Sequence, residues 1–132
     1  MKRLLDTNAY VALLKGDAGV AEQVRSAEGL AFSMVVVGEL LFGFRNGNRY
    51  ERNLAALDDF LNQPWVEIHL VTRTTADRFG RIAASLRKAG TPIPTNDIWI
   101  AAHTLETGAE LLTFDRHFAA VPGLPVTILP RG

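Results

Sequence analysis

The sequence has no cysteine, no excess of either charge and no long apolar run. The absence of Cys among its 132 residues excludes disulfides, thiolate metal ligands and a cysteine nucleophile. Basic and acidic residues balance at 14 each, so any surface that binds nucleic acid must be local. No apolar run reaches the ~18 residues of a membrane span, and the first residues are too polar for a signal peptide. We therefore expect a cytoplasmic protein with no membrane contact.

Apolar residues make up 48% of the chain, which predicts a folded protein rather than a disordered one. Residues 1–132 suit one domain with one core. Short strands are expected to alternate with helices, which is typical of a parallel sheet covered on both faces. We predict an α/β fold with four or five strands. The first strand ends at Asp6, and the others cover residues 30–32, 66–70, 110–115 and 126–129. The helices between them are expected at 9–15, 18–27, 34–44, 54–62, 72–89 and 98–107.

The N-terminal stretch places an acid directly after a buried strand. Leu4 and Leu5 precede Asp6, and Thr7 or Asn8 is expected to cap the following helix. Ligands of open α/β sheets collect at the carboxyl ends of the strands, which is where Asp6 would lie. The alternative is that Asp6 is itself only a helix cap.

Four acids stand in apolar surroundings. Two of them end apolar strands, one lies inside an apolar helix, and one opens a helix behind a proline-rich loop; they are Asp6 and Asp115, Glu39, and Asp97. Burying an unpaired carboxylate costs several kcal/mol. Basic partners, helix N-termini or a shared divalent cation could compensate that cost, although a helix N-terminus would not serve Glu39. We call these residues the four acids below.

A shared site made of carboxylates would favour Mg²⁺ or another hard cation. Such a cation neutralises phosphate oxygens and lowers the pKa of water, which suits hydrolysis of a phosphodiester. No histidine is required, and His69, His103 and His117 are expected to be surface residues or local hydrogen-bonding groups.

Four blocks of the sequence, in this order and over nearly the whole chain, resemble the PIN-domain ribonucleases and, more narrowly, the VapC toxins of bacterial type II toxin–antitoxin systems. The blocks are Leu5-Asp6-Thr7-Asn8, Val37-Gly38-Glu39-Leu40-Leu41-Phe42-Gly43, Asn96-Asp97-Ile98-Trp99-Ile100-Ala101-Ala102 and Leu111-Leu112-Thr113-Phe114-Asp115. A lone Asp-Thr-Asn is a weak signal, whereas the four blocks together are specific.

The resemblance implies a metal-dependent endoribonuclease with a single PIN domain. The four acids would be its catalytic residues and would hold Mg²⁺ or Mn²⁺, with Asp6 and Asp97 as direct ligands. Glu39 and Asp115 would act directly or through water. Thr7 and Thr113 match supporting polar positions. The implied partners are RNA, a VapB-type antitoxin that occludes the active site, and a second copy in a homodimer.

RNA must be held by local positive charge. Three groups of basic residues are candidates: Arg45, Arg49 and Arg52; Arg116 with His117; and Arg78, Arg81, Arg87 and Lys88. Each can equally belong to an ordinary solvated face. Tyr10 and Trp99 could stack on bases or could be core residues.

Other functions would need residues or properties that can be compared with this sequence. A catalytically silent PIN-like module that binds a partner would keep the fold without cleaving RNA. A phosphatase that forms an aspartyl-phosphate would need an acid at the position of Asn8, and a receiver domain would need a mid-chain acid at a strand end and a lysine near the last strand. The sequence supplies neither arrangement. Nucleotide-binding glycine motifs are also absent.

Overall fold

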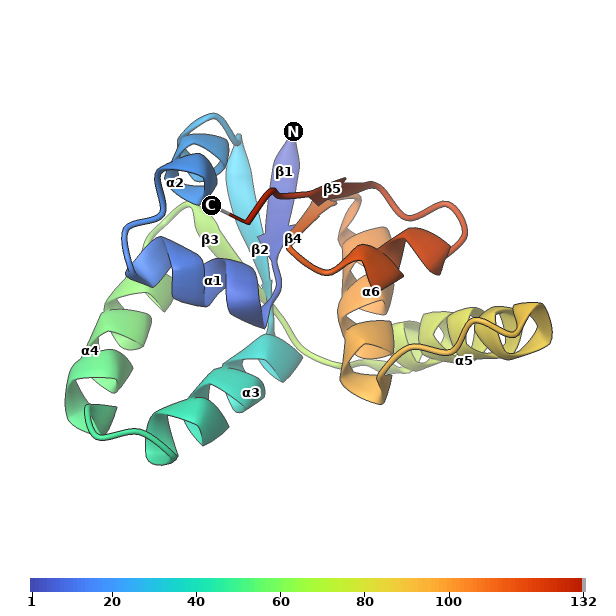
Figure 1. The fold of residues 1–132 in the computed structure, drawn as a ribbon, viewed down its shortest axis with the longest axis horizontal. Coiled ribbons are helices and arrows are strands. Elements are labelled where there is room, and N and C mark those ends of the chain that lie inside the picture. Colours follow the sequence, from blue (N-terminus) through green and yellow to red (C-terminus); the bar gives the residue numbers. More distant parts are fainter. Residues whose placement is uncertain (132) are drawn as a thin grey trace.

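Five parallel strands form one sheet in the computed structural model, which describes residues 1–131 (Figure 1). The strand order is β3-β2-β1-β4-β5, so the first strand of the chain lies at the centre. This confirms the predicted α/β fold with a parallel sheet; the last residue of the predicted domain, Gly132, lies outside the described residues. The strands are β1 (Lys2–Leu5), β2 (Gly29–Ser33), β3 (Val66–His69), β4 (Glu110–Thr113) and β5 (Val126–Ile128).

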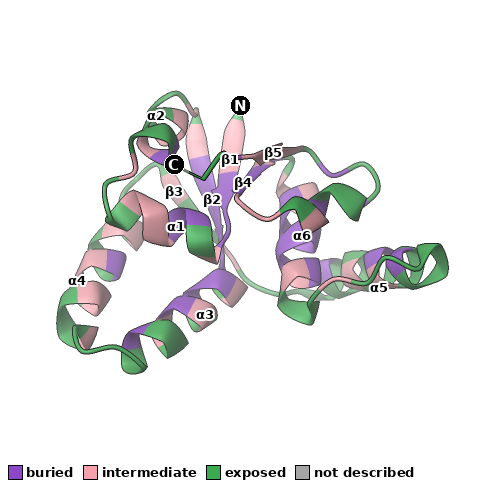
Figure 2. Ribbon diagram, viewed as in Figure 1, coloured by how far each residue is buried: buried purple, intermediate pink, exposed green. Residues whose placement is uncertain are grey.

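The central strands are apolar because both faces of the sheet are covered. Leu4 pairs in register with Ala31 on one side and with Leu111 on the other, and all three are fully buried. Continuous apolar runs of this kind are typical of parallel strands covered by helices. Figure 2 shows the buried residues running through the strands and along α3 and α6. The carboxyl ends of β1, β2 and β4 are thereby fixed by the core.

Helices lie on both sides of the sheet. In Figure 1, α1, α2 and α4 gather on one side, and α5 and α6 on the other. Within residues 1–131, no helix is both long and apolar enough to cross a membrane. The helices are α1 (Thr7–Leu14), α2 (Ala18–Arg25), α3 (Met34–Arg45), α4 (Tyr50–Leu61), α5 (Arg73–Ala89) and α6 (Thr95–Thr107), with a 3₁₀ turn, η1 (Arg116–Ala120).

Polar residues and glycines define several helix ends. Ser33 caps α3, and Thr72 caps α5. Gly90 and Gly108 end α5 and α6 with φ of 74° and 70°, a left-handed conformation that glycine adopts without steric cost. These four residues thus fix the start of α3, which carries Glu39, both ends of α5, and the end of α6, which carries Asp97.

Three predicted helix starts were wrong. Helix α4 begins at Tyr50 rather than at residue 54. The N-cap of α1 is Asp6 rather than Thr7 or Asn8, because Asp6 has the extended backbone of a cap and its Oδ1 accepts a bond from Ala9 N. Helix α6 begins at Thr95, so Asp97 lies inside the first turn rather than at its start. Pro94 precedes that turn with φ of −55°, a value that is compatible with a helix start, so the proline-rich loop is shorter than predicted.

A buried histidine joins three elements next to the carboxyl end of β2. His103 Nδ1 on α6 lies 2.7 Å from Ser33 Oγ, and His103 Nε2 lies 3.1 Å from the carbonyl oxygen of Leu70. Because that carbonyl can only accept, Nε2 carries the proton and Nδ1 accepts from the hydroxyl. His103 is fully buried, so of the two roles predicted for it, the surface one does not apply and the hydrogen-bonding one does.

This histidine predicts an acid-sensitive fold. Burial lowers the pKa of His103 below its usual 6.5, while Leu70 and Glu106 oppose that shift and His69 adds to it. The unfolded chain therefore takes up a proton first as pH falls below 6.5, and the free energy of unfolding falls by at most ~1.4 kcal/mol per pH unit from this group. Urea unfolding at pH 7.5 and 5.5 measures the decrease. We expect a smaller decrease in His103→Gln, and equal decreases in the two chains would contradict this role.

Candidate functional site

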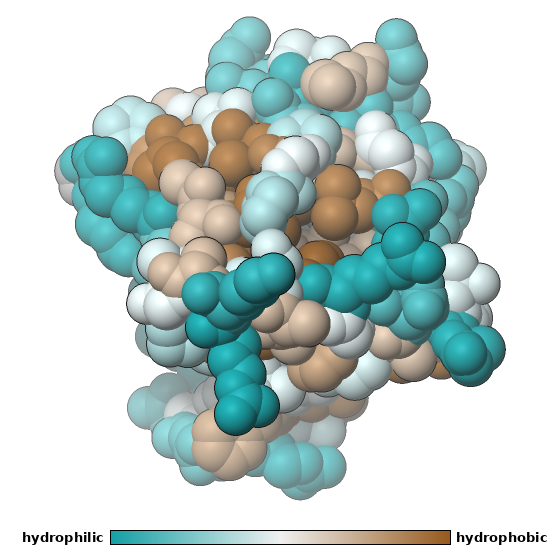
Figure 3. Space-filling view, turned by 90° about the vertical axis from the view of Figure 1, so that its right-hand side faces the viewer, coloured by the Kyte–Doolittle hydropathy of each residue, from teal (hydrophilic) through white to brown (hydrophobic). Residues whose placement is uncertain are grey.

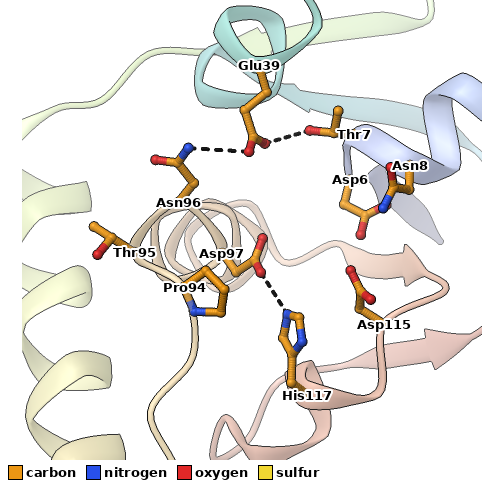
Figure 4. A pocket seen from close by; sticks show the side chains of 10 residues that line it. All are labelled: Asp6, Thr7, Asn8, Glu39, Pro94, Thr95, Asn96, Asp97, Asp115 and His117. Carbon is orange, nitrogen blue, oxygen red and sulfur yellow. Dashed lines mark hydrogen bonds and ion pairs between the residues drawn. The ribbon is translucent and has the colours of Figure 1, made fainter. Parts of the chain in front are cut away.

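The four acids line one cavity of about 530 Å³ at the carboxyl edge of the sheet (Figure 4). Asp6 directly follows β1, Asp115 follows β4, Glu39 lies in α3 after β2, and Asp97 lies in the first turn of α6. In Figure 4 their carboxylates face a common space. The sheet thus brings together residues that are far apart in the sequence.

Asp6 is the most buried of the four acids, with 4% of its surface exposed. Its Oδ1 accepts from Ala9 N at 2.9 Å, and its Oδ2 accepts from Thr113 Oγ1 at 2.5 Å. Burial raises its pKa to about 6, helped by the nearby charges of Asp115 and Asp97, and these two hydrogen bonds only partly oppose the rise. Asp6 is therefore a helix cap, but capping does not remove the cost of its charge.

Asp97 has a histidine partner. His117 Nε2 in η1 lies 2.7 Å from Asp97 Oδ2, so the ring N–H donates to the carboxylate. Burial raises the pKa of Asp97; His117 lowers it, and Glu39 and Asp115 raise it further. The net direction is upward although a histidine is in contact, which indicates that the position favours added positive charge.

Glu39 is held by two side chains from other elements. Thr7 Oγ1 donates to Oε1 at 2.5 Å, and Asn96 Nδ2 donates to Oε2 at 3.2 Å. These bonds fix the carboxylate at the cavity wall without neutralising it. The predicted supporting role of Thr7 has a structural basis here, and Asn96 is a second partner of Glu39.

Thr113 links two of the four acids. Its hydroxyl donates to Asp6, and the same oxygen accepts from Asp115 N at 3.0 Å. It is fully buried at the end of β4. Thr113 therefore orients the carboxylate of Asp6 and the backbone of Asp115, which gives the supporting role implied by the resemblance a structural basis.

The donor set of the cavity fits a hard divalent cation. It offers carboxylate, amide and hydroxyl oxygens and contains no thiolate, which matches the preference of Mg²⁺ and Mn²⁺. Among residues 1–131, no group of three or more His, Asp or Glu side chains is arranged as a metal site as it stands. One oxygen of Asp97 accepts a hydrogen bond from His117, and Glu39 accepts from Thr7 and Asn96. Binding of a cation by these oxygens would require the side chains to give up some of these hydrogen bonds.

None of the four acids forms an ion pair with a lysine or an arginine of the described chain. Asp6, Asp97 and Asp115 lie at the N-termini of α1, α6 and η1, so the positive end of a helix dipole can offset part of the cost of burying each charge. Glu39 lies inside α3 and has only neutral hydrogen-bond donors. Within residues 1–131, a lysine or arginine partner is therefore excluded for the four acids, and the basic partner found among them is His117, beside Asp97.

One cavity residue, His117, has a partner that the sequence did not predict, and the two aromatic residues for which base stacking or core packing was left open both pack within the chain. His117 had no recognisable partner, because its contact with Asp97 depends on how η1 packs against α6. Tyr10 is buried with 2% exposure and packs edge-on against Phe32, so it is a core residue. Trp99 stacks on Phe79 with ring centroids 4.0 Å apart, which accounts for it by packing within the chain.

Comparisons with known proteins agree with this architecture. The PIN domain family model matches residues 3–124. Ribonuclease VapC1 of Haemophilus influenzae is 31% identical over 83% of this chain and 84% of that protein, and the tRNA(fMet)-specific endonuclease VapC of Shigella flexneri is 31% identical over 94% and 95%. The crystal structure of VapBC2 from Rickettsia felis, bound to a DNA fragment from their promoter, contains a chain with a TM-score of 0.84, 27% identity and coverage of 96% and 98%. This chain therefore belongs to the PIN domain family and, within it, to the VapC group.

Proposed function

We propose that this chain is a Mg²⁺- or Mn²⁺-dependent endoribonuclease and the toxin component of a VapBC-type module. One observation carries the proposal: the four acids line one cavity, and no lysine or arginine of residues 1–131 pairs with them. Relatives named as VapC ribonucleases support the choice of RNA as substrate. Such an enzyme would act in the cytoplasm.

The surroundings of each residue in the cavity indicate its role in the proposed reaction. Asp6 and Asp97 would be the direct metal ligands, since burial raises the pKa of both. Glu39 and Asp115 would bind directly or through water at the rim. A cation held there would neutralise charge on phosphate oxygens and would lower the pKa of a bound water. Thr7 and Thr113 would keep two carboxylates in place through the transition state.

The proposal is tested by incubating the purified chain with single-stranded RNA and Mg²⁺ or Mn²⁺. We expect internal cuts in RNA and no release of phosphate from small monoesters. The alternative is a catalytically silent PIN-like module that binds a partner, and it predicts that the RNA stays intact with Mg²⁺ and with Mn²⁺. RNA that stays intact with both metals would contradict the proposed activity.

We also propose an antitoxin partner that covers the cavity and a homodimer of the chain itself. The support for a VapB-type partner is that similar chains were crystallised as VapBC complexes. A basic side chain of the partner inserted among the four acids would supply the cation that they lack. Exposed apolar side chains, such as Phe42 at 70% and Leu70 at 60%, are available for contacts between chains. Inhibition of RNA cleavage by the co-expressed partner, and the mass of each form in solution, are the checks.

A further inference from the structure

A second hollow joins the cavity of the four acids. It has a volume of about 640 Å³ and lies between α1, α3 and α4. Thr7, Asn8 and Glu39 line both hollows, so the second one is a continuation of the first. We call it the α1–α3–α4 groove. A long substrate that reaches the four acids could pass through it.

Three unpaired cations line this groove. Lys15, Arg49 and Arg52 are exposed, and none of them forms an ion pair with another residue of the described chain. By contrast, Arg81 on α5 is paired with Asp77, and Arg45 lies over the ring of Tyr50. The groove therefore adds positive charge directly beside four carboxylates, in a chain whose total charge is zero.

This charge arrangement suits a polyanion that must approach an acidic site. The phosphates next to the scissile one would be repelled by the four acids unless nearby cations hold them. The floor of the groove is apolar, with Val11 and Leu14 partly open to solvent and Phe44 beneath. Unstacked bases can lie on such a surface, whereas the bases of a duplex are turned inward. The groove thus combines phosphate contacts with a surface for single-stranded bases.

We infer that the α1–α3–α4 groove binds a single-stranded RNA segment adjacent to the scissile phosphate, with Arg49 and Arg52 contacting its phosphates. The inference rests on the proposed function, which it deepens by assigning the path of the substrate. The basic residues of α5 extend on another side of the molecule. Figure 3 shows that side, where hydrophilic side chains project between separate apolar patches. The basic residues of α5 therefore serve as the matched comparison for those of the groove.

The test compares Arg49→Ala/Arg52→Ala with Arg78→Ala/Arg87→Ala. Both variants lose two exposed arginines that make no ion pair within residues 1–131, so they change the total charge equally. For the first variant we expect KM for single-stranded RNA to rise about tenfold with kcat nearly unchanged, because phosphate contacts outside the reacting atoms give uniform binding. The salt dependence of KM should weaken by a slope of about 1.4 for two lost contacts. The α5 variant should keep the parent values.

Binding of a fluorescent single-stranded RNA in EDTA separates this inference from the nuclease proposal. Tight binding by the parent and weak binding by Arg49→Ala/Arg52→Ala support the groove even if no RNA is cut. Equal KM, salt slope and RNA binding in parent and groove variant would overturn the inference. If the groove variant keeps these values but no longer binds an antitoxin protein, the groove is a protein-docking site instead.

Discussion

Asp6→Asn and Asp97→Asn chains are expected to lose RNA cleavage by about a thousandfold or more while staying folded. Each substitution removes a negative charge from a cavity in which four carboxylates converge. Loss of several kcal/mol of charge stabilisation in the transition state corresponds to about a thousandfold in rate. Initial rates on one RNA substrate, together with circular dichroism and urea unfolding of each chain, provide the measurement.

Both variants should keep the fold. Asn caps helices as well as Asp does, so the bond from Ala9 N to residue 6 can persist. Asn at position 6 also carries no charge in a position that is 4% exposed, so we expect the free energy of unfolding at pH 7.5 to equal or exceed that of the parent. A variant that unfolds would therefore be explained by something other than lost capping.

Glu39→Gln and Asp115→Asn should have smaller effects, about tenfold to a hundredfold, because these two carboxylates are proposed to act directly or through water, whereas Asp6 and Asp97 are proposed as the direct ligands. The matched control is Asp77→Asn, which removes an exposed acid whose partner is Arg81 on α5. It should cut RNA at the parent rate. If folded Asp6→Asn and Asp97→Asn also cut at that rate, the cavity is not the active site.

Removal of divalent cations is expected to abolish cleavage, and Mg²⁺ or Mn²⁺ should restore it. The same ions should stabilise the fold, since a ligand at one hundred times its Kd adds about 2.7 kcal/mol to the free energy of unfolding. This corresponds to a rise in Tm of several degrees for a chain of this size. Dialysis against EDTA, followed by titration with each ion in both assays, measures the two effects.

The stabilisation should depend on the four acids. In Asp6→Asn and Asp97→Asn the added ions should no longer raise Tm, because a buried carboxylate whose pKa is raised by burial is replaced by a neutral amide. Asp77→Asn should respond as the parent does. Cleavage that persists after EDTA dialysis, with unchanged Tm on adding Mg²⁺, would rule out a resident cation.

Local patterns predicted most of the elements, because each depends on nearby residues. Apolar runs marked β1 and β4, and Gly90 and Gly108 marked helix ends. One error arose where several neighbouring residues can fill the same role. Asp6, Thr7 and Asn8 can all cap a helix, and only the backbone geometry decides in favour of Asp6.

Pairings between distant residues could not be predicted from composition or spacing. The order of the strands, the bond between His117 and Asp97, and the bond from Asn96 to Glu39 arise from packing. The four acids could be singled out as candidates from the sequence because carboxylates in apolar surroundings are unusual and need a reason. Their convergence on one cavity required the fold.

The bond between Thr113 and Asp6 spans 107 residues, and it joins the first strand of the chain to a strand near its end. Strand β4 lies directly beside the central β1, so one half of the sheet stays open until the last part of the polypeptide is available. During translation, a ribosome that has made only the first hundred residues thus carries a nascent chain without an assembled cavity. A frameshift or stop codon before β4 would leave a product that lacks both Thr113 and Asp115, whatever the state of its other helices.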